Sequence, residues 1–367
     1  MTQKRVVVAM SGGVDSSVAA LMLARQGYEV IGVSLRLFTD ERPDAAPLNR
    51  GCCTAEDIED ARRVCQLIGA RHYVVNAERE FRDFVINYFL REYQRGRTPH
   101  PCIACNDRIK FDFLLERALA LDASLIATGH YARIRHEPNG EFSLLRAIDH
   151  TKDQSYVLFG LSQAQLGRLS FPVGDLTKLE IRQLALEANL PVAGKPDSQE
   201  ICFIPMGDYR EFLKKEQTPI PGKIVDLSGQ VLGNHPGIGF FTIGQRRGLG
   251  VTSEQPLYVI DLEPGTQRVV VGPEEALYAS GLQASMVNWV DGLREHDPID
   301  VLVKTRYKSI DTPAKLIPDG SSIEIRFHTP QRAITPGQAV VFYQGDRLLG
   351  GGFIDQPIRV ENVLALS

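Results

Sequence analysis

Residues 4–18 read KRVVVAMSGGVDSSV, and this stretch decides the fold. Its first part is an apolar run with strand propensity, and Gly12 and Gly13 let the backbone turn tightly before a helix that continues to Gly27. The free N–H groups at the start of that helix, together with the serine hydroxyls of the turn, suit an anion. The lysine of a Walker A loop is missing, so we interpret the turn as a pyrophosphate site of another kind.

Strand and helix patterns alternate outward from this turn. Residues 29–38, 72–77 and 122–130 have strand character, and Thr54 and Asp57 have the spacing of a capping box at the start of a helix over 54–70. Such alternation predicts a Rossmann-like parallel sheet with helices on both faces. Ligands bind at the carboxyl ends of the strands in these sheets, and both SGGVDSS (11–17) and ATGHYAR (127–133) fall there.

The composition bounds the class of protein. Of 367 residues, 43% are hydrophobic and 23% charged, which is typical of a soluble globular protein. No apolar run reaches membrane-spanning length and the N-terminal one is too short for a signal peptide, so we expect a cytoplasmic protein that does not contact membranes. The net charge of −4 excludes a generally basic nucleic-acid coat but allows local basic patches.

The chain divides into three expected domains. Residues 1–210 hold the α/β pattern, including a helix over 176–191 whose Thr177 and Glu180 form a second capping box. Turn-rich sequence with short strands predicts a small β-rich central domain over 211–280. Alternating runs such as SSIEIRF (321–327) predict a C-terminal β-barrel over 281–367.

The turn resembles the PP-loop of the ATP pyrophosphatase superfamily, whose members cleave ATP between the α and β phosphates. With HPCIACNDRIKF (100–111), ATGHYAR, DHTKDQSYVLFGL (149–161) and KPDSQEICFIP (195–205), it resembles the bacterial tRNA-specific 2-thiouridylases of the MnmA type over nearly the whole chain. The resemblance implies ATP-dependent 2-thiolation of the wobble uridine, with Asp15 holding Mg²⁺ or orienting phosphates. It implies an ATP site made of Ala9, Met10, Ser11, Gly12, Gly13, Val14, Asp15, Ser16, Leu35 and Gly129.

Six cysteines are few for this length, which favours catalytic, redox or metal roles over a disulfide scaffold. By resemblance, Cys105 is the nucleophile and Cys202 carries a persulfide. A persulfide can attack an activated C2, and a second thiol can resolve the product through a disulfide. Lys195 offers a charge that could lower the pKa of a nearby thiol. Cys65 lies on the buried stripe of its helix and is interpreted as a packing residue. Cys52 and Cys53 are either a loop pair near the ATP site or packed thiols, and a structural role is favoured.

At Cys102 the chain departs from the commoner family pattern. The family stretch NPDxxC reads HPCIAC here, so a histidine replaces the asparagine and a cysteine the aspartate. Two alternatives stay open. Cys102 is a spare thiol beside a two-cysteine persulfide route, or Cys102, Cys105 and Cys202 bind a 4Fe–4S cluster whose free iron takes sulfide.

Contacts with tRNA are expected in local basic segments, because the whole chain is slightly acidic. The arginines of REYQRGRTPH (91–100) are more simply a solvated face. By resemblance, the tRNA contacts are His100, Pro101, Cys102, His130, Lys152, Asp153, Gln154, Arg306, Tyr307 and Gln338.

Two rival functions remain from the sequence. One is another PP-loop tRNA-modifying or amidating ligase, which would not need Cys105 and Cys202. The other is a non-catalytic ATP- or metal-sensing RNA-binding protein. The expected sulfur donor is a sulfur-relay protein, a cysteine desulfurase or free sulfide, and the sequence does not choose among them.

Overall fold

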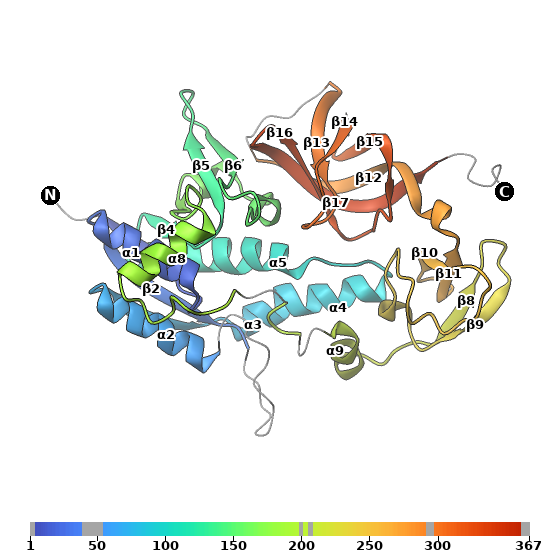
Figure 1. The fold of residues 1–367 in the computed structure, drawn as a ribbon, viewed down its shortest axis with the longest axis horizontal. Coiled ribbons are helices and arrows are strands. Elements are labelled where there is room, and N and C mark those ends of the chain that lie inside the picture. The colour runs from blue at the N-terminus through green and yellow to red at the C-terminus, as the bar shows by residue number, and fades with distance from the viewer. Residues whose placement is uncertain (1–3, 39–53, 198–200, 205–207, 291–296, 361–367) are drawn as a thin grey trace.

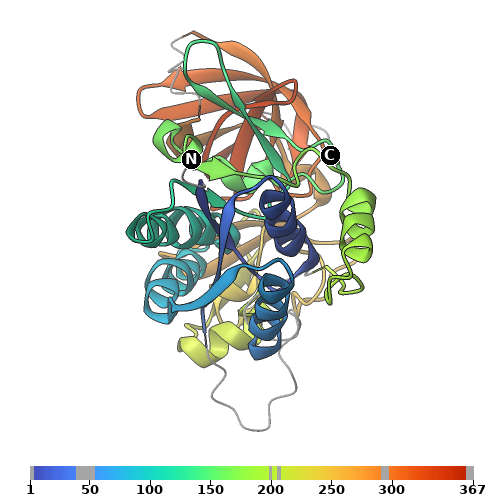
Figure 2. The ribbon, with the colours of Figure 1, turned by 90° about the vertical axis from the view of Figure 1, so that its left-hand side faces the viewer.

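The computed structural model describes residues 4–38, 54–197, 201–204, 208–290 and 297–360. An α/β unit, a small β-rich unit and a barrel follow one another along the chain, and the barrel lies above the helices of the α/β unit (Figures 1 and 2). Among the described helices, none has both the length and the apolar character needed to cross a bilayer. The predicted fold class is confirmed.

The α/β unit is built on a five-stranded parallel sheet. Its strand order is β3-β2-β1-β4-β7, and Val7 of the central strand is in register with Ile31 and Ile126 of its two neighbours. The strands are β1 (Arg5–Ala9), β2 (Glu29–Arg36), β3 (Arg71–Asn76), β4 (Leu125–Ala127) and β7 (Leu169–Ser170). All pairs run parallel, as the alternating pattern predicts.

Successive side chains of β1 enter two separate cores, because neighbouring residues of a strand point to opposite faces. Val6 and Val8 pack with the three helices of one face, and Val7 packs with the longer helices of the other. The first face carries α1 (Val14–Arg25), α2 (Ala55–Leu67) and α8 (Lys178–Glu187). Both predicted capping boxes, at the starts of α2 and α8, are confirmed.

The second face carries two long, continuous helical stretches. Each is α-helical at its ends and wound as a π-helix between them. The first consists of α3 (Glu78–Phe81), η1 (Arg82–Ile86) and α4 (Asn87–Gln94), and the second of α5 (Pro101–Ala104), η2 (Cys105–Phe113) and α6 (Leu114–Ala120). Pro101 suits the first turn of α5 because its missing N–H would have no helical partner there. Cys105 is the first residue of the π-wound segment, a conformation often found at functional sites.

The C-terminal unit is a closed six-stranded antiparallel barrel. Its strands follow the order β12-β15-β14-β13-β16-β17, and β12 pairs with β17 to close it. They are β12 (Tyr278–Trp289), β13 (Ile299–Lys304), β14 (Thr312–Asp319), β15 (Ser322–Arg332), β16 (Ala339–Gln344) and β17 (Arg347–Arg359).

A hairpin from the α/β unit joins this barrel, which the sequence analysis did not predict. Strand β6 (Phe142–Arg146) pairs with β17, and β5 (Ala132–His136) pairs with β6. The Asn139–Gly140 pair in the loop is a hairpin signal that identifies the turn but not its partner.

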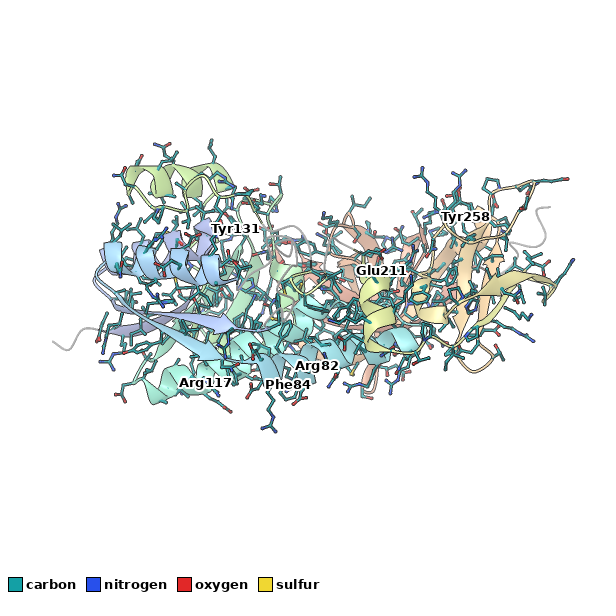
Figure 3. The ribbon with its side chains drawn as sticks, turned by 90° about the horizontal axis from the view of Figure 1, so that it is seen from below. Arg82, Phe84, Arg117, Tyr131, Glu211 and Tyr258 are labelled. Atoms are coloured by element: carbon teal, nitrogen blue, oxygen red, sulfur yellow. The ribbon has the colours of Figure 1, made fainter. Side chains whose placement is uncertain are left out.

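The central unit is a four-stranded sheet of order β10-β11-β8-β9. Its elements are α9 (Tyr209–Glu216), β8 (Gly222–Val225), β9 (Val231–His235), η5 (Ile238–Phe240), β10 (Tyr258–Glu263), β11 (Arg268–Gly272) and η6 (Glu274–Leu277). Short segments elsewhere are η3 (Ser155–Leu158) and α7 (Gln163–Leu166). Seen from below, Glu211 of α9 lies at the side of the central unit that is nearer the α/β unit, and Tyr258 lies farther along the central unit (Figure 3). One hydrophobic core contains Phe89, Val259 and Val341, so it links all three units.

Candidate active site

The PP-loop connects β1 to α1 at the carboxyl end of the sheet. Gly13 is the N-cap of α1 and makes no side-chain capping bond, in contrast to the capping boxes of α2 and α8. Ser16 Oγ lies 3.2 Å from both the backbone nitrogen and Oγ of Ser11, which holds the turn closed. The first N–H groups of α1 are therefore available to an anion at the positive end of the helix dipole.

Two glycines let the backbone approach this loop closely. Gly12 has φ +72°, and a Cβ there would lie 2.2 Å from the carbonyl oxygen of Asp57 in α2. A Cβ on Gly129, after β4, would lie 2.5 Å from the backbone nitrogen of Ser16. Gly12 and Gly129, two of the three predicted ATP-site glycines, are thus in contact with backbone, where no side chain fits. Leu35 is buried near the end of β2, the neighbouring strand.

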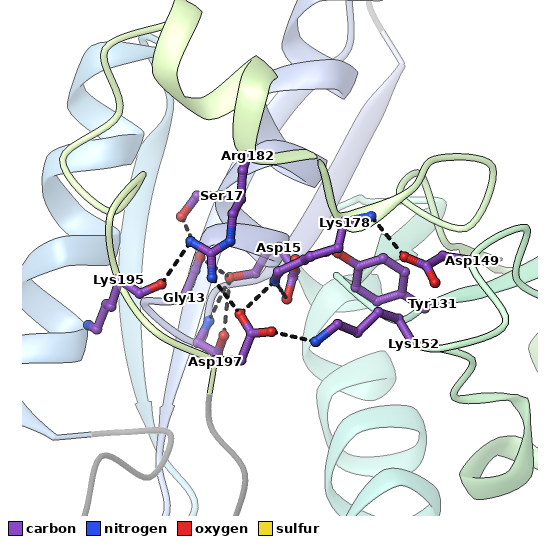
Figure 4. A network of polar contacts seen from close by, with 12 residues as sticks. Gly13, Asp15, Ser17, Tyr131, Asp149, Lys152, Lys178, Arg182, Lys195 and Asp197 are labelled. Atoms are coloured by element: carbon purple, nitrogen blue, oxygen red, sulfur yellow. Dashed lines mark hydrogen bonds and ion pairs between the residues drawn. The ribbon is translucent and has the colours of Figure 1, made fainter. Parts of the chain in front are cut away.

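Asp15 is the centre of a charged network (Figure 4). Its Oδ1 accepts hydrogen bonds from Tyr131 Oη and Lys178 Nζ, both at 2.7 Å. Lys178 Nζ also lies 2.8 Å from Asp197 Oδ1, and Lys152 Nζ lies 2.7 Å from Asp197 Oδ2. Burial by itself would raise the pKa of Asp197, but the hydrogen bonds from Lys152 and Lys178 outweigh burial and hold this pKa at about 2. Arg182 completes the network, 2.9 Å from Asp197 Oδ1.

Lys195 lies against the PP-loop rather than acting on a thiol. Its Nζ donates to the carbonyl oxygen of Gly12 at 3.0 Å and pairs with Asp57 and Asp60, each at 2.7 Å. Burial alone would lower the pKa of Lys195, but these two carboxylates raise it. The sequence-based suggestion that Lys195 activates a cysteine is therefore wrong, because its charge is already balanced by two carboxylates.

Cys105 and Cys202 both border the same hydrophobic core, each partly buried. Cys105 begins the π-wound segment, and the next residue, Asn106, donates to the carbonyl oxygen of Val157 at 3.0 Å. Cys202 precedes Phe203, whose buried ring packs edge-on against Phe89 at a centroid distance of 5.3 Å. The local structure thus anchors the segments that carry both thiols.

Cys65 behaves as the sequence predicts. It is fully buried on α2, and burial raises its pKa to about 11, so the thiolate does not form near neutral pH. Cys52 and Cys53 lie outside the described residues.

Several predicted tRNA contacts meet where the barrel covers α5. The ring of Tyr307 lies 6.1 Å from that of His100, and burial first, then the nearby Asp153 and Cys102, raise the pKa of Tyr307 to about 12. Cys102 is exposed and Pro101 buried. Gln338 donates to the carbonyl oxygen of Thr98 at 2.8 Å.

His100 has an unusual environment in this cluster. Burial lowers its pKa to about 4, so the ring is neutral at physiological pH. Its Nδ1 is buried and has no hydrogen-bond partner among the described residues. A neutral ring with an unmet hydrogen bond suits an uncharged ligand group better than a phosphate.

The remaining predicted tRNA contacts have internal partners. Asp153 is buried and accepts from the backbone nitrogen of Ala147 at 3.0 Å, while Gln154 Oε1 accepts from that of Tyr131 at 3.0 Å. His130 is buried with its Nδ1 2.6 Å from Thr128 Oγ1, and burial lowers its pKa well below the usual value. Contact of these side chains with tRNA stays a prediction, and in this structure their first role is to hold the loops around Asp15.

Three family models match consecutive parts of the chain. They are described as a tRNA methyl transferase HUP domain (residues 4–206), a tRNA methyl transferase PRC-barrel domain (210–273) and an aminomethyltransferase beta-barrel domain (279–354). A relative from Pelotomaculum thermopropionicum, named tRNA-specific 2-thiouridylase MnmA, is 47% identical over 97% of this chain and 98% of its own length. One of the same name from Geobacter metallireducens is 50% identical over 96% of this chain and 97% of its own.

The chain belongs to the tRNA-specific 2-thiouridylase family. The name of this family is that of a sulfurtransferase enzyme, which confirms the prediction of an enzyme of that class. A solved structure titled as a complex of a 4-thiouridine synthetase with RNA and bound ATP aligns with 58% of this chain and 50% of its own, at 18% identity and a TM-score of 0.34. We draw no conclusion from so low a likeness.

The cluster alternative for this 2-thiouridylase family member finds no support in the geometry. All three cysteines are described, yet no group of three His, Cys, Asp or Glu side chains in the described ranges is arranged to hold a metal ion. Cys102, Cys105 and Cys202 do not fit a 4Fe–4S cluster in this arrangement, and we derive no step through one.

Sequence reasoning missed Tyr131, Lys178 and Arg182. Tyr131 and Lys178 contact Asp15 from 116 and 163 positions away, so no local pattern marks them. Two signals were available. Tyr131 lies in ATGHYAR, which the sequence places at the carboxyl end of a strand, and Lys178 directly follows the Thr177 cap of a predicted helix of the α/β unit.

Proposed function

We propose that this protein replaces O2 of a tRNA wobble uridine with sulfur, at the expense of ATP. The observation that carries the proposal is the near full-length match to 2-thiouridylases in a chain that joins a PP-loop to two thiols bordering one core. We place the reaction in the cytoplasm, where unmodified tRNA is found.

In the first step, uracil O2 attacks the α-phosphorus of ATP and pyrophosphate leaves. Oxygen bound to carbon is a poor leaving group, and this step turns it into AMP. The open N–H groups of α1 would bind the phosphates. Asp15 offers carboxylate oxygens, the ligands Mg²⁺ prefers, and its side chain is 30% exposed at the loop, so it fits a role in holding that ion. Mg²⁺ bound there would neutralise phosphate charge.

Lys178 would respond to the nucleotide. In this structure the ammonium of Lys178 lies between the carboxylates of Asp15 and Asp197 and pairs with both. Asp15 would help to hold Mg²⁺, and the ammonium of Lys178, 2.7 Å from Asp15, would then be near enough to the loop to pair with a phosphate oxygen. It would thereby do the work of the lysine that the PP-loop lacks.

In the second step, sulfur replaces the activated oxygen. The outer sulfur of a Cys202 persulfide attacks C2, and AMP leaves with the former O2. Cys105 thiolate then attacks Cys202 Sγ, the S–S bond breaks, and its electron pair stays on the sulfur bound to C2 as the thiocarbonyl forms. The Cys105–Cys202 disulfide that remains is then opened in one of two ways. A thiol reductant reduces it, and a donor protein that carries its own persulfide transfers the outer sulfur to the Cys202 thiolate. Alternatively, sulfide attacks Cys202 Sγ in the disulfide, which forms the Cys202 persulfide directly and releases the Cys105 thiolate.

The target base would lie beside Cys102. Chemistry on C2 needs an unstacked base, and Tyr307 and His100 provide aromatic faces there. The neutral, unpartnered His100 Nδ1 can meet a polar atom of uracil.

The test is thiolation of unmodified tRNA with ATP, Mg²⁺, a reductant and a sulfur donor, scored as 2-thiouridine after digestion. Cys202→Ala is expected to lose product while still releasing pyrophosphate in the presence of tRNA, and Cys105→Ala is expected to lose product as well. Metal-free Cys102→Ser is expected to stay active if the persulfide route operates, whereas activity that returns only with iron and sulfide would favour the cluster. Full 2-thiouridine formation by a Cys105→Ala/Cys202→Ala double variant would refute the two-cysteine route. If the wild-type chain makes no 2-thiouridine and the double variant keeps full tRNA-dependent pyrophosphate release, sulfur transfer is refuted and an amidating ligase is favoured. ATP binding without pyrophosphate release would favour a non-catalytic RNA binder.

A further inference from the structure

We propose that a loop of the central unit, residues 242–250, is a phosphate-binding site for the RNA and extends the tRNA surface of the barrel. The inference rests on the proposed tRNA substrate. It assigns a role to Arg246 and Arg247, which lie outside the tRNA contacts implied by the family resemblance.

The loop touches the barrel beside Arg306. A Cβ on Gly244 would lie 2.9 Å from Ala333 Cβ and 3.7 Å from a terminal nitrogen of Arg332. The guanidinium of Arg306 donates to the carbonyl oxygen of Ala333, and its pKa is lowered by burial and then by the nearby charge of Arg332. Arg246 and Arg247 follow Gly244 by two and three residues, so the loop that contacts Arg332 and Ala333 also carries these two arginines.

These charges are poorly balanced. Only Arg332 has a carboxylate partner, Glu274, at 2.9 Å. In the described ranges no acidic side chain lies within ion-pair distance of Arg246, Arg247 or Arg306, and the side chains of Arg246 and Arg247 are exposed. An exposed arginine without a carboxylate partner keeps its charge available to an anion.

A second arginine group shows the contrast. Arg97 lies 2.8 Å from the buried carboxylate of Glu92 and 3.5 Å from Asp355 of the barrel, and Arg95 also pairs with Glu92. That group ties the α/β unit to the barrel, and its charges are already neutralised. Both pairs, Arg95 with Arg97 and Arg246 with Arg247, are basic in sequence. They differ in that only the first pair has carboxylate partners.

The loop is also held in shape. Gln245 Oε1 accepts from the backbone nitrogen of Thr242 at 3.2 Å, and Gln245 Nε2 donates to the carbonyl oxygen of Arg247 at 3.0 Å. Backbone bonds join Gly244 and Gln245 to Val259 of β10 at 2.8 and 2.9 Å. A preformed loop loses little conformational entropy on binding, which favours a binding role over a mobile tether.

An open hollow lies beside the two arginines. It has a volume of about 260 Å³, and Gly248 and Gly250, both at positive φ, are part of its lining. The lining residues are Arg246, Gly248, Leu249, Gly250, Val251, Ser253, Gln255, Pro256 and Leu257. Its wall of backbone, serine and glutamine is polar, and it carries no acidic side chain on its lining. Such a wall suits phosphate and ribose oxygens rather than an apolar segment.

The surface is continuous with the proposed base pocket. Arg306 adjoins Tyr307, whose ring faces His100 beside Cys102. An RNA strand with its uridine at Cys102 could therefore pass Arg306 and reach Arg246 and Arg247. A regularly spaced polyanion fits a row of separate arginines better than a single small anion does.

The experiment compares Arg246→Gln/Arg247→Gln with the wild-type chain for tRNA binding over a potassium chloride series. Each lost phosphate contact should lower the slope of log Kd against log salt by about 1, so the double variant is expected to lose about 1 to 2 units of slope. Arg62→Gln/Arg63→Gln is the matched control, because these neighbouring exposed arginines of α2 already pair with Glu59. Arg246→Lys/Arg247→Lys should restore most of the slope, which separates lost charge from a damaged loop.

An unchanged slope and Kd in the Gln variant would overturn the proposal. The proposal would also be overturned if the Gln variant bound RNA normally and lost activity only when a sulfur donor protein replaced sulfide. In that case the loop would be a docking site for the donor protein. The Kd for tRNA is measured without the thiolation reaction, so it does not depend on catalysis. If the wild-type chain made no 2-thiouridine, the proposed function would be refuted, but the binding comparison could still be carried out.

Discussion

Replacement of Gly129 by alanine is expected to disable the ATP site without unfolding the protein. The new Cβ would lie 2.5 Å from Ser16 N, 2.7 Å from Asp15 C and 3.0 Å from Asp15 Cβ. Two of these atoms belong to the backbone at the start of α1, so they cannot swing aside as the end of a long side chain could.

The size of the effect follows from the distances. Ordinary contact begins near 3.4 Å, so Gly129→Ala must separate the two backbones by about 0.9 Å. Overpacking of this kind typically costs about 1–3 kcal/mol of folding free energy. A displacement of roughly 1 Å between reacting groups costs about 100-fold in rate, so kcat/KM for ATP should fall by about two orders of magnitude.

The assay is tRNA-dependent pyrophosphate release at varied ATP, with ATP affinity measured separately by calorimetry. Gly194→Ala is the matched control, since no atom lies within 4 Å of a Cβ built there and its φ is not positive. Its kinetics should match those of the wild-type chain. Wild-type ATP affinity and kcat/KM in Gly129→Ala would refute the reasoning, because the contact with Ser16 and Asp15 would then have no functional weight.

Two further substitutions test the charged groups. Lys178→Met removes the ammonium that the carboxylates of Asp15 and Asp197 share. The KM for ATP should therefore rise at least about tenfold in steady-state kinetics. An unchanged KM would exclude the proposed contact between Lys178 and a phosphate. Asp107 has one buried carboxyl oxygen without a partner in the described chain, and its pKa is raised, chiefly by burial, from 3.8 to about 7. The folded state therefore holds this proton more tightly, and the stability it contributes is complete below about pH 4 and lost as pH rises through 7. Between about pH 5 and pH 8 the free energy of unfolding of Asp107→Asn should fall by about 2–3 kcal/mol less than that of the wild-type chain, as unfolding experiments would show. The control Asp83→Asn, at an exposed position, should keep the wild-type pH dependence. A wild-type pH profile in Asp107→Asn would contradict the assignment of this pH dependence to Asp107.

Local features could be predicted from the sequence because neighbours in the chain make them. Thr54 with Asp57 and Thr177 with Glu180 form their capping boxes within one helical turn. The PP-loop is likewise set by a strand, two glycines and the start of a helix that are adjacent in sequence. The parallel sheet follows from the same reasoning, since alternating strands and helices have few other ways to bury their apolar faces.

The pairing of the hairpin at residues 132–146 could not be predicted. Its Asn139–Gly140 turn is local, but the choice between the parallel sheet and the barrel depends on β17, about 200 residues later. A strand edge pairs with whatever complementary edge lies beside it in space, and nothing in the hairpin specifies that edge.

By itself, the sequence determined the PP-loop, the order of elements and the identity of the thiols, because each depends on residue type or on contacts between near neighbours. Only the tertiary structure decided the state of the charges. Lys195 and Arg97 are neutralised by carboxylates from other segments, Lys178 is shared between two aspartates, and Arg246 and Arg247 remain unpaired among the described residues. The physical reason is that Coulomb and hydrogen-bond energies depend on distances of a few ångströms between side chains, and folding sets those distances without regard to separation along the chain.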